Sequence, residues 1–261
     1  LSLAGRGLKD VAPAAGDLNR DGLEDILIGL DDGTLLYFEN TGLNNGEYEF
    51  DETSLNITPN DVGRFASPAI GDIDGDGRNE ILIGEMDGNL NLYSFDGQSY
   101  QLQNDTFGGI YDIFYSAPHI ADLDTNFIAD YLIGHSNGLK IAYNVNDPQA
   151  KLNPVDTFVH NRLSVETGSL KNVTRVYPTT AKLDIDVYPD LILGNHLGGI
   201  LFLGSQERTR NAIFPGFGDD LFVSKEVKVY PNPADNRVVI DNLSQIGISE
   251  IRIVDVQGRN V

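Results

Sequence analysis

The fold is decided by a stretch in the first half of the chain, which reads Pro68-Ala-Ile-Gly-Asp72-Ile-Asp-Gly-Asp-Gly-Arg-Asn-Glu80-Ile-Leu-Ile-Gly84. The same pattern recurs three more times, at Pro13–Gly29, Pro118–Gly134 and Pro178–Gly194. In every copy the proline lies 16 positions before the glycine, and a polar, mostly acidic segment separates two short apolar ones. Self-similarity at intervals of 50 to 60 residues indicates a repeat architecture.

Each repeat has the local pattern of several short strands. In the second copy the acidic segment is followed by the apolar run Ile81-Leu-Ile, a turn at Asp87-Gly88 and the alternating segment Asn89–Phe95. Two strands joined by an Asp-Gly turn form a hairpin. The strand before the acidic segment and a fourth, more variable strand complete a unit of the size of a propeller blade. A β-solenoid has shorter coils and a β-sandwich lacks such internal identity, so both alternatives are disfavoured. We therefore predict an all-β chain with four visible, four-stranded β-propeller blades over residues 1–215.

Composition excludes several classes of protein. The 261 residues include 18 Lys and Arg against 39 Asp and Glu, a net charge of −21 that argues against a nucleic-acid partner or an anionic membrane surface. The apolar fraction of 41% is too high for a disordered chain, and no run of 18 apolar residues predicts a membrane span. Cysteine is absent, which removes disulfides, zinc–thiolate sites and cysteine nucleophiles.

The acidic segment has the spacing of a calcium loop. In the second copy Asp72, Asp74, Asp76 and Glu80 occupy loop positions 1, 3, 5 and 9, with Gly77 at the sharp turn. Calcium takes about six to eight hard oxygens, and alternate side chains on a tight loop converge to supply them, together with a position-7 carbonyl. The predicted ligands of the three loops are Asp17, Asn19, Asp21, Leu23 (carbonyl) and Asp25; Asp72, Asp74, Asp76, Arg78 (carbonyl) and Glu80; and Asp122, Asp124, Asn126, Ile128 (carbonyl) and Asp130. We expect about three Ca²⁺ ions.

Two alternatives to this interpretation can be weighed. An EF-hand needs a bidentate Glu at position 12 and flanking helices, whereas position 12 here is Ile28, Ile83 or Ile133, inside strands. An Asp-rich turn that binds nothing would explain one loop, but three loops with the same spacing make it a poor explanation.

The fourth loop departs from the pattern. Lys182 stands at position 1, while Asp184, Asp186 and Asp190 keep positions 3, 5 and 9. An ammonium group among three carboxylates can take the place of a metal ion. We interpret this loop as a metal-free site closed by an internal ion pair; a Lys182 that points to solvent is the alternative.

The repeats resemble the FG-GAP/VCBS repeats of calcium-binding β-propellers, which integrin α-subunit heads and many secreted bacterial proteins share. The resemblance covers roughly residues 10–215 and is most specific in the first two copies. It implies that the loop joins the first two strands of a blade, that ligands bind on the opposite face, and that the blades belong to a larger ring of seven or so. A closed four-bladed ring is the alternative. His135 and His196 fall near turns of that opposite face, as possible ligand contacts or as solvated turn residues.

The tail is a separate signal. Val227-Lys-Val-Tyr-Pro-Asn-Pro233 and the later Glu250–Arg259 resemble the C-terminal sorting domain of the type IX (Por) secretion system of Bacteroidota. Strands separated by a Pro-rich turn predict the start of a small, truncated β-sandwich over residues 227–261, after a linker at 216–226. The resemblance implies contact with the type IX machinery and a secreted or outer-membrane-surface location in a Gram-negative Bacteroidota bacterium.

Catalytic motifs such as His-Glu-x-x-His, Gly-x-Ser-x-Gly or a phosphate-binding loop are absent from the sequence. We therefore expect a non-catalytic, calcium-stabilised propeller for adhesion or for binding an extracellular glycan or protein. The alternative is the propeller of a secreted polysaccharide lyase or other extracellular enzyme. A lyase would need Arg or Lys to hold uronates, and the basic residues are few and scattered along the sequence.

Overall fold

The computed structural model describes residues 5–110, 113–143, 145–154, 157–160, 163–166, 175–182, 188–196, 200–203, 229–230 and 239–240. These residues form strands, turns and loops, with no α-helix among them, which confirms the all-β class. Among them there is accordingly no helix of a length and apolarity suited to crossing a membrane.

The first two repeats fold as predicted into antiparallel sheets of four consecutive strands. In the first blade the order is β1-β2-β3-β4. In the second blade it is β6-β7-β8-β9, with the short β5 added in parallel to β9. The strands are β1 (Ala12–Gly16), β2 (Asp25–Gly29), β3 (Leu35–Asn44), β4 (Glu47–Thr53), β5 (Ile57–Thr58), β6 (Ser67–Gly71), β7 (Glu80–Gly84), β8 (Leu90–Phe95) and β9 (Tyr100–Asn104).

The third blade differs from the prediction, since its described sheet has three strands rather than four. After β12 the chain turns at Asp147, whose carbonyl accepts the Ala150 N–H, and Pro148 inside this turn has no N–H for a ladder. Leu152 then bonds to Gly108 at the end of the second blade. The strands are β10 (Ala117–Ala121), β11 (Asp130–His135) and β12 (Gly138–Ala142), followed by a separate hairpin of β13 (Thr157–His160) and β14 (Leu163–Glu166).

The fourth blade gains its outer strands from far along the sequence. Its sheet order is β15-β16-β17-β18-β19, and Ile200 of β17 pairs with Val229 of β18. The two strands described at the start of the tail pair with each other and extend this sheet; the small β-sandwich stays a prediction. The linker predicted at residues 216–226 lies outside the described residues. The strands are β15 (Val176–Ala181), β16 (Asp190–Asn195), β17 (Ile200–Leu203), β18 (Val229–Tyr230) and β19 (Val239–Ile240).

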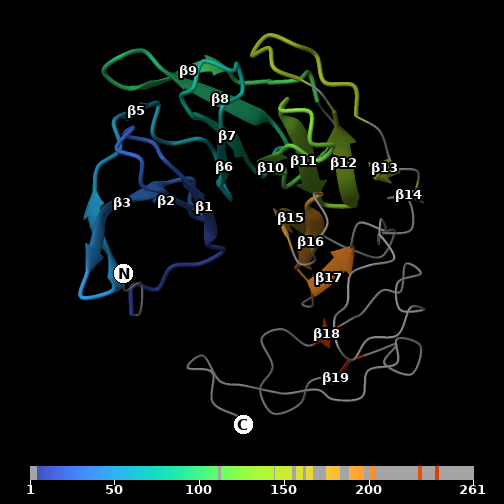
Figure 1. The fold of residues 1–261 in the computed structure, drawn as a ribbon, viewed down its shortest axis with the longest axis horizontal. Helices are drawn as coiled ribbons and strands as arrows, with labels where there is room; N and C mark the ends of the chain where they lie inside the picture. Colours follow the sequence, from blue (N-terminus) through green and yellow to red (C-terminus); the bar gives the residue numbers. More distant parts are fainter. Residues whose placement is uncertain are drawn as a thin grey trace.

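The four sheets are arranged in an arc around their first strands (Figure 1). β1 contacts β6, β6 contacts β10, and β10 contacts β15, while the later strands of each blade lie farther out. The pairing register is the same in all four blades. In each, the proline of the first strand lies opposite the residue that precedes the glycine of the repeat. The pairs are Pro13 with Ile28, Pro68 with Ile83, Pro118 with Ile133 and Pro178 with Leu193. This arrangement is that of successive propeller blades.

Apolar side chains fill the spaces between blades. On β7, Ile81 and Ile83 pack toward the first blade, whereas Leu82 packs toward the third. All three are fully buried, as expected for a middle strand covered on both faces, because successive side chains point to opposite faces. On β16, Leu191 and Leu193 are buried against the third blade.

The glycine at or next to the end of the second strand marks a close contact between blades in the first three repeats. A Cβ added at Gly29, Gly84 or Gly134 would collide with the backbone carbonyl of Ala66, Ser116 or Val176 in the following blade. Only glycine fits there, which explains its place in the repeat. At Gly194 the nearest atom to such a Cβ is the carbonyl of Tyr177 in the same blade, 3.8 Å away. Among the described residues, this face of the fourth blade meets no further blade.

Candidate metal-binding loops

Each acidic loop joins the first and second strands of its blade, so the loops lie at the same end of successive sheets. Asp72 follows directly after β6, and Glu80 is the first residue of β7. The strand pairing places Glu80 opposite Gly71, at the last pair of the ladder. The loop therefore closes over a carboxylate whose position is fixed by the sheet.

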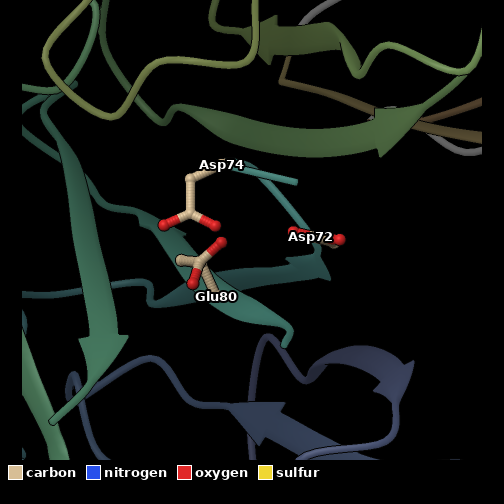
Figure 2. A group of neighbouring side chains, drawn as sticks. All are labelled: Asp72, Asp74 and Glu80. Atoms are coloured by element: carbon tan, nitrogen blue, oxygen red, sulfur yellow. The ribbon is translucent and has the colours of Figure 1, made fainter. Parts of the chain in front are cut away.

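The second loop brings three carboxylates together. Ligand oxygens of Asp72, Asp74 and Glu80 lie within 4.8 Å of one another, and Figure 2 shows the Asp74 and Glu80 carboxylates facing each other. Asp72 and Asp74 are exposed, whereas Glu80 is only 2% exposed at the base of the loop. Burial, followed by the nearby charges of the loop aspartates, raises the pKa of Glu80 to about 7.

Backbone N–H groups hold the loop in shape. The carboxylate of Asp72 accepts the N–H of Gly75 at 2.8 Å and that of Gly77 at 3.0 Å. The Ile73 N–H donates to Glu80 at 2.8 Å. Asp74 and Asp76 each accept the N–H two residues later, at 3.0 and 2.7 Å. The carboxylates are thus oriented before any ion arrives.

The third loop has the same geometry in spite of its different sequence. Oxygens of Asp122, Asp124 and Asp130 lie within 4.8 Å of one another. The buried Asp130 accepts the Leu123 N–H at 2.7 Å, as Glu80 accepts that of Ile73. Where the second loop has Gly77, the third has Phe127, with a φ of 66° and a side chain that is 96% exposed.

Sequence reasoning foresaw one turn in these loops, but the structure has two. Position 6 has a positive φ in all three loops, and so does position 4, at Arg20, Gly75 and Thr125. In the sequence, Gly75 was the residue that could have indicated this second turn. Arg20 and Thr125 gave no indication, because side chains other than Gly, Asn and Asp rarely adopt this conformation.

The first loop is built on the same frame, but its carboxylates are used differently. Asp17 accepts the N–H groups of Arg20 and Gly22, at 2.6 and 2.9 Å. Asp25 is fully buried and accepts three hydrogen bonds, from the Leu18 N–H (3.1 Å), the Tyr37 hydroxyl (2.8 Å) and the Asn40 N–H (2.9 Å). Of the described carboxylates, those of this loop are not among the groups that meet within 4.8 Å.

Several residues around the loops were missed by sequence reasoning. Tyr37 and Asn40 on β3 hold Asp25, and Glu39 accepts the Asn19 side-chain amide at 3.1 Å. The Tyr100 hydroxyl bonds to the carbonyls of Leu18 and Asn79, at 3.1 and 3.2 Å, and so connects the first two loops. These partners lie on the third or fourth strand of a blade. The alternation of apolar and polar residues predicts which side chains of such a strand are buried, but not which atoms they contact.

The remaining predicted site residues are placed as follows. The position-7 residues Leu23, Arg78 and Ile128 donate their N–H groups to the position-5 side chains, at 2.8, 2.7 and 2.8 Å, and their carbonyls remain predicted ligands. In the fourth loop Lys182 is exposed and Asp190 is buried, while Asp184 and Asp186 lie outside the described residues.

The two histidines of the opposite face lie where the sequence predicted, near the β11–β12 and β16–β17 turns. His135 Nδ1 accepts the Asn137 N–H at 3.3 Å, a contact that shapes its own turn. His196 is exposed. Their role in binding a ligand stays a prediction.

Comparisons with known proteins agree with this architecture. A family model for an FG-GAP-like repeat matches residues 17–83, and a model for a secretion system C-terminal sorting domain matches residues 228–261. No curated protein matches the chain.

Two solved structures are similar at 18% identity. One is the Tc holotoxin pore of Photorhabdus luminescens, with a TM-score of 0.39 over 69% of this chain and 8% of that chain. The other is an Agrocybe aegerita lectin described as recognising non-reducing terminal N-acetylglucosamine, with a TM-score of 0.43 over 76% of this chain and 50% of the lectin. The chain thus spans half or less of the length of these structures. With its two family matches, it is an all-β protein with an FG-GAP-like repeat and a sorting domain that indicates export through type IX secretion.

Proposed function

We propose that this protein is a calcium-stabilised, non-catalytic binding module that acts outside the cell or on its surface. The observation that carries this proposal is the convergence of three carboxylates within 4.8 Å in both the second and the third loop. A shared geometry in two repeats of different sequence supports a common ligand rather than two chance acidic turns.

The residues fit calcium by their chemistry. The two groups consist of carboxylates, without a Cys or His, and the further proposed donors are amide and carbonyl oxygens. All of these are the hard oxygen ligands that Ca²⁺ prefers. Carboxylates this close repel one another on a chain that already carries a charge of −21. A bound Ca²⁺ would supply two positive charges and fix the loop to the sheet through the buried Glu80 or Asp130.

The ligand is assigned to the end of the blades opposite the loops. The match to a sorting domain supports a location outside the cytoplasm, where an extracellular ligand is met. We infer that this surface binds an extracellular glycan or protein, as adhesion modules do.

The experiment that tests the metal is thermal unfolding with calcium, with magnesium and with chelator. Binding to the folded state alone stabilises by about 2.7 kcal/mol per site at 100 times Kd. We expect a large increase in Tm with calcium, reduced by about a third by Asp72→Asn or Asp122→Asn.

Asp96→Asn is the matched control. Asp96 also accepts backbone N–H groups in a tight turn, from Gln98 and Ser99 at 2.9 Å each, but lies outside the loops. Its variant should keep the full calcium effect. Equal Tm values with calcium and chelator in the parent protein would overturn the proposal.

Export is tested by removing residues 227–261 and locating the protein in a Bacteroidota host. We expect the shortened protein to stay in the periplasm and to keep its calcium-dependent unfolding. Because Val229 pairs with Ile200, the fourth blade should lose β18 and β19 and a small part of its stability. Normal surface display of the shortened protein would contradict the sorting role.

A further inference from the structure

A second set of equivalent residues lies at the end of the blades opposite the calcium loops. Asp10, Phe65, Tyr115 and Arg175 each stand three positions before the proline of a first strand, and each has a positive φ, of 46°, 58°, 57° and 51°. Three of them donate their N–H to the preceding blade, to the carbonyls of Asp31, Met86 and Ser136 at 3.1, 3.0 and 3.3 Å. These bonds between blades hold the backbone in a conformation that such side chains rarely adopt.

Two arginines and two aromatic rings meet there. The Arg175 Cζ lies 3.8 Å from the ring centroid of Tyr115 and 4.5 Å from that of Phe65, and the Arg64 Cζ lies 5.2 Å from the Phe65 centroid. The two rings are 5.2 Å apart at an interplanar angle of 72°. This arginine–aromatic cluster, defined as Arg64, Phe65, Tyr115 and Arg175, gathers cations that are scattered in the sequence.

The guanidinium of Arg175 is incompletely satisfied. Its Nε and Nη2 atoms are buried and have no hydrogen-bond partner within the part of the chain that the structure describes. A buried donor without an acceptor costs about 1–3 kcal/mol, and more when it is charged. Nε–H and Nη2–H point in parallel from one edge of the guanidinium, the edge that a carboxylate accepts in bidentate fashion. The cluster therefore lacks one planar, two-oxygen acceptor.

We infer that the arginine–aromatic cluster is a binding subsite for the carboxylate of a uronic acid at the end of a glycan chain. This inference rests on the proposed function and names its ligand class. The unpaired Nε–H and Nη2–H groups of Arg175 favour a carboxylate, which can accept both. A protein with a net charge of −21 repels a polyanion, which favours one terminal charge on a neutral chain. Phe114 precedes Tyr115 in the sequence and is 57% exposed, which leaves an apolar ring open to a sugar.

One group of the chain itself competes for this role. Asp10 occupies the equivalent position in the first blade and is exposed. The pKa of Tyr177 is raised by burial first, with a smaller contribution from the charge of Asp10, and it is lowered by Arg175. The charge of Asp10 thus acts on the neighbourhood of Arg175, and the experiment separates Asp10 from a ligand as the partner of this arginine.

The test is calorimetric titration of the full chain, saturated with calcium, with a trisaccharide that ends in glucuronate and with the same trisaccharide ending in glucose. We expect the glucuronate form to bind at least tenfold more tightly. Arg175→Gln should abolish this preference, and Arg175→Lys should abolish it too, because an ammonium keeps the charge but not the fork. Lys151→Gln removes an exposed cation elsewhere and should change nothing.

Three results would overturn the inference: equal affinity for the two sugars, full binding by Arg175→Lys, or binding of a peptide C-terminal carboxylate but not of glucuronate. If Asp10 is the acceptor, Asp10→Asn and Arg175→Gln should destabilise equally and without additivity, which also contradicts the inference; we expect Asp10→Asn to bind glucuronate at least as well as the parent. Calcium-dependent unfolding of each variant, and binding of the neutral sugar, report separately on the proposed function.

Discussion

The second and third acidic loops arrive at one geometry from different sequences. Both bring the carboxylates of positions 1, 3 and 9 within 4.8 Å, although the second loop has Gly77 at its turn and the third has Phe127. In both, the position-9 carboxylate is buried and accepts the N–H of position 2. In these two loops the flanking strands fix the position-9 carboxylate, and the carboxylates converge with either Gly77 or Phe127 at position 6.

The largest effect should come from removing the buried carboxylate in each loop. Glu80→Gln and Asp130→Asn keep an oxygen that can accept the N–H of Ile73 or Leu123, but they remove one negative charge from the proposed metal ligands. With calcium, each variant should lose roughly 3 kcal/mol of unfolding free energy, the contribution of one well-filled site. With chelator, each should equal or exceed the parent in stability, because one of three repelling charges is gone. Denaturant unfolding under both conditions measures this, and equal losses in the two conditions would show that the role of the carboxylate is purely structural.

The strand that leads into the third loop should make stability depend on pH, whereas the equivalent strand of the second loop should not. β10 carries His119 where β6 has Ala69, and the His119 Nε2 lies 2.9 Å from the Thr180 hydroxyl of the fourth blade. Burial lowers the pKa of His119 to about 4. The His119 side chain takes up a proton near pH 6.5 in the unfolded chain but only near pH 4 in the folded chain. The stability that the folded protein has with neutral His119 is therefore complete above pH 6.5 and is lost as the pH falls toward 4. The loss in unfolding free energy over this range is roughly 3 kcal/mol.

The measurement is the difference in unfolding free energy between the parent and His119→Gln, followed from pH 7.5 to 4 in chelator. The loop carboxylates titrate in both proteins and therefore cancel in that difference. As the pH falls, the unfolding free energy of the parent should decrease more than that of the variant. A gap that does not change with pH would contradict the burial of His119 as a neutral group.

A smaller effect is expected from exchanging the turn residues. Phe127 adopts a φ of 66° with its side chain in solvent, so Phe127→Gly should relieve strain and raise stability by about 1 kcal/mol. In the second loop Gly77, at a φ of 81°, should lose about as much on change to Ala. Thermal unfolding in chelator checks both. A loss of stability in Phe127→Gly would mean that this side chain has a contact of its own.

How far the sequence predicted this molecule depends on the distance between interacting residues. The repeat spacing predicted four equivalent units, and the apolar run after each acidic segment predicted its second strand. Position 9 was predicted as a loop residue, whereas in the structure it is the first residue of that strand. Contacts between distant segments could not be predicted, because no local pattern specifies them. Examples are Tyr37 and Asn40 against Asp25, Arg175 against Phe65 and Tyr115, and Val229 against Ile200.

The smallest expected difference lies in the calcium affinities. The sequence predicts the order second, first, third, because charge count and loop geometry set affinity. In the structure, the carboxylates of the third loop converge, while Asp25 of the first loop already accepts three hydrogen bonds. Calorimetry on Asp17→Asn, Asp72→Asn and Asp122→Asn assigns each binding step. A first loop weaker than the third would show that convergence matters more than the turn glycine.

The most direct test of the account is the number of calcium ions bound, measured by mass spectrometry under native conditions. The account predicts three in the parent protein and two in both Asp72→Asn and Asp122→Asn. Lys182→Asp should bind a fourth, because the fourth blade has the same register and the substitution adds the position-1 carboxylate to Asp184, Asp186 and Asp190, although Val187 replaces the turn glycine. No bound calcium, or a number that the two loop variants leave unchanged, would contradict the claim that the repeat builds calcium sites.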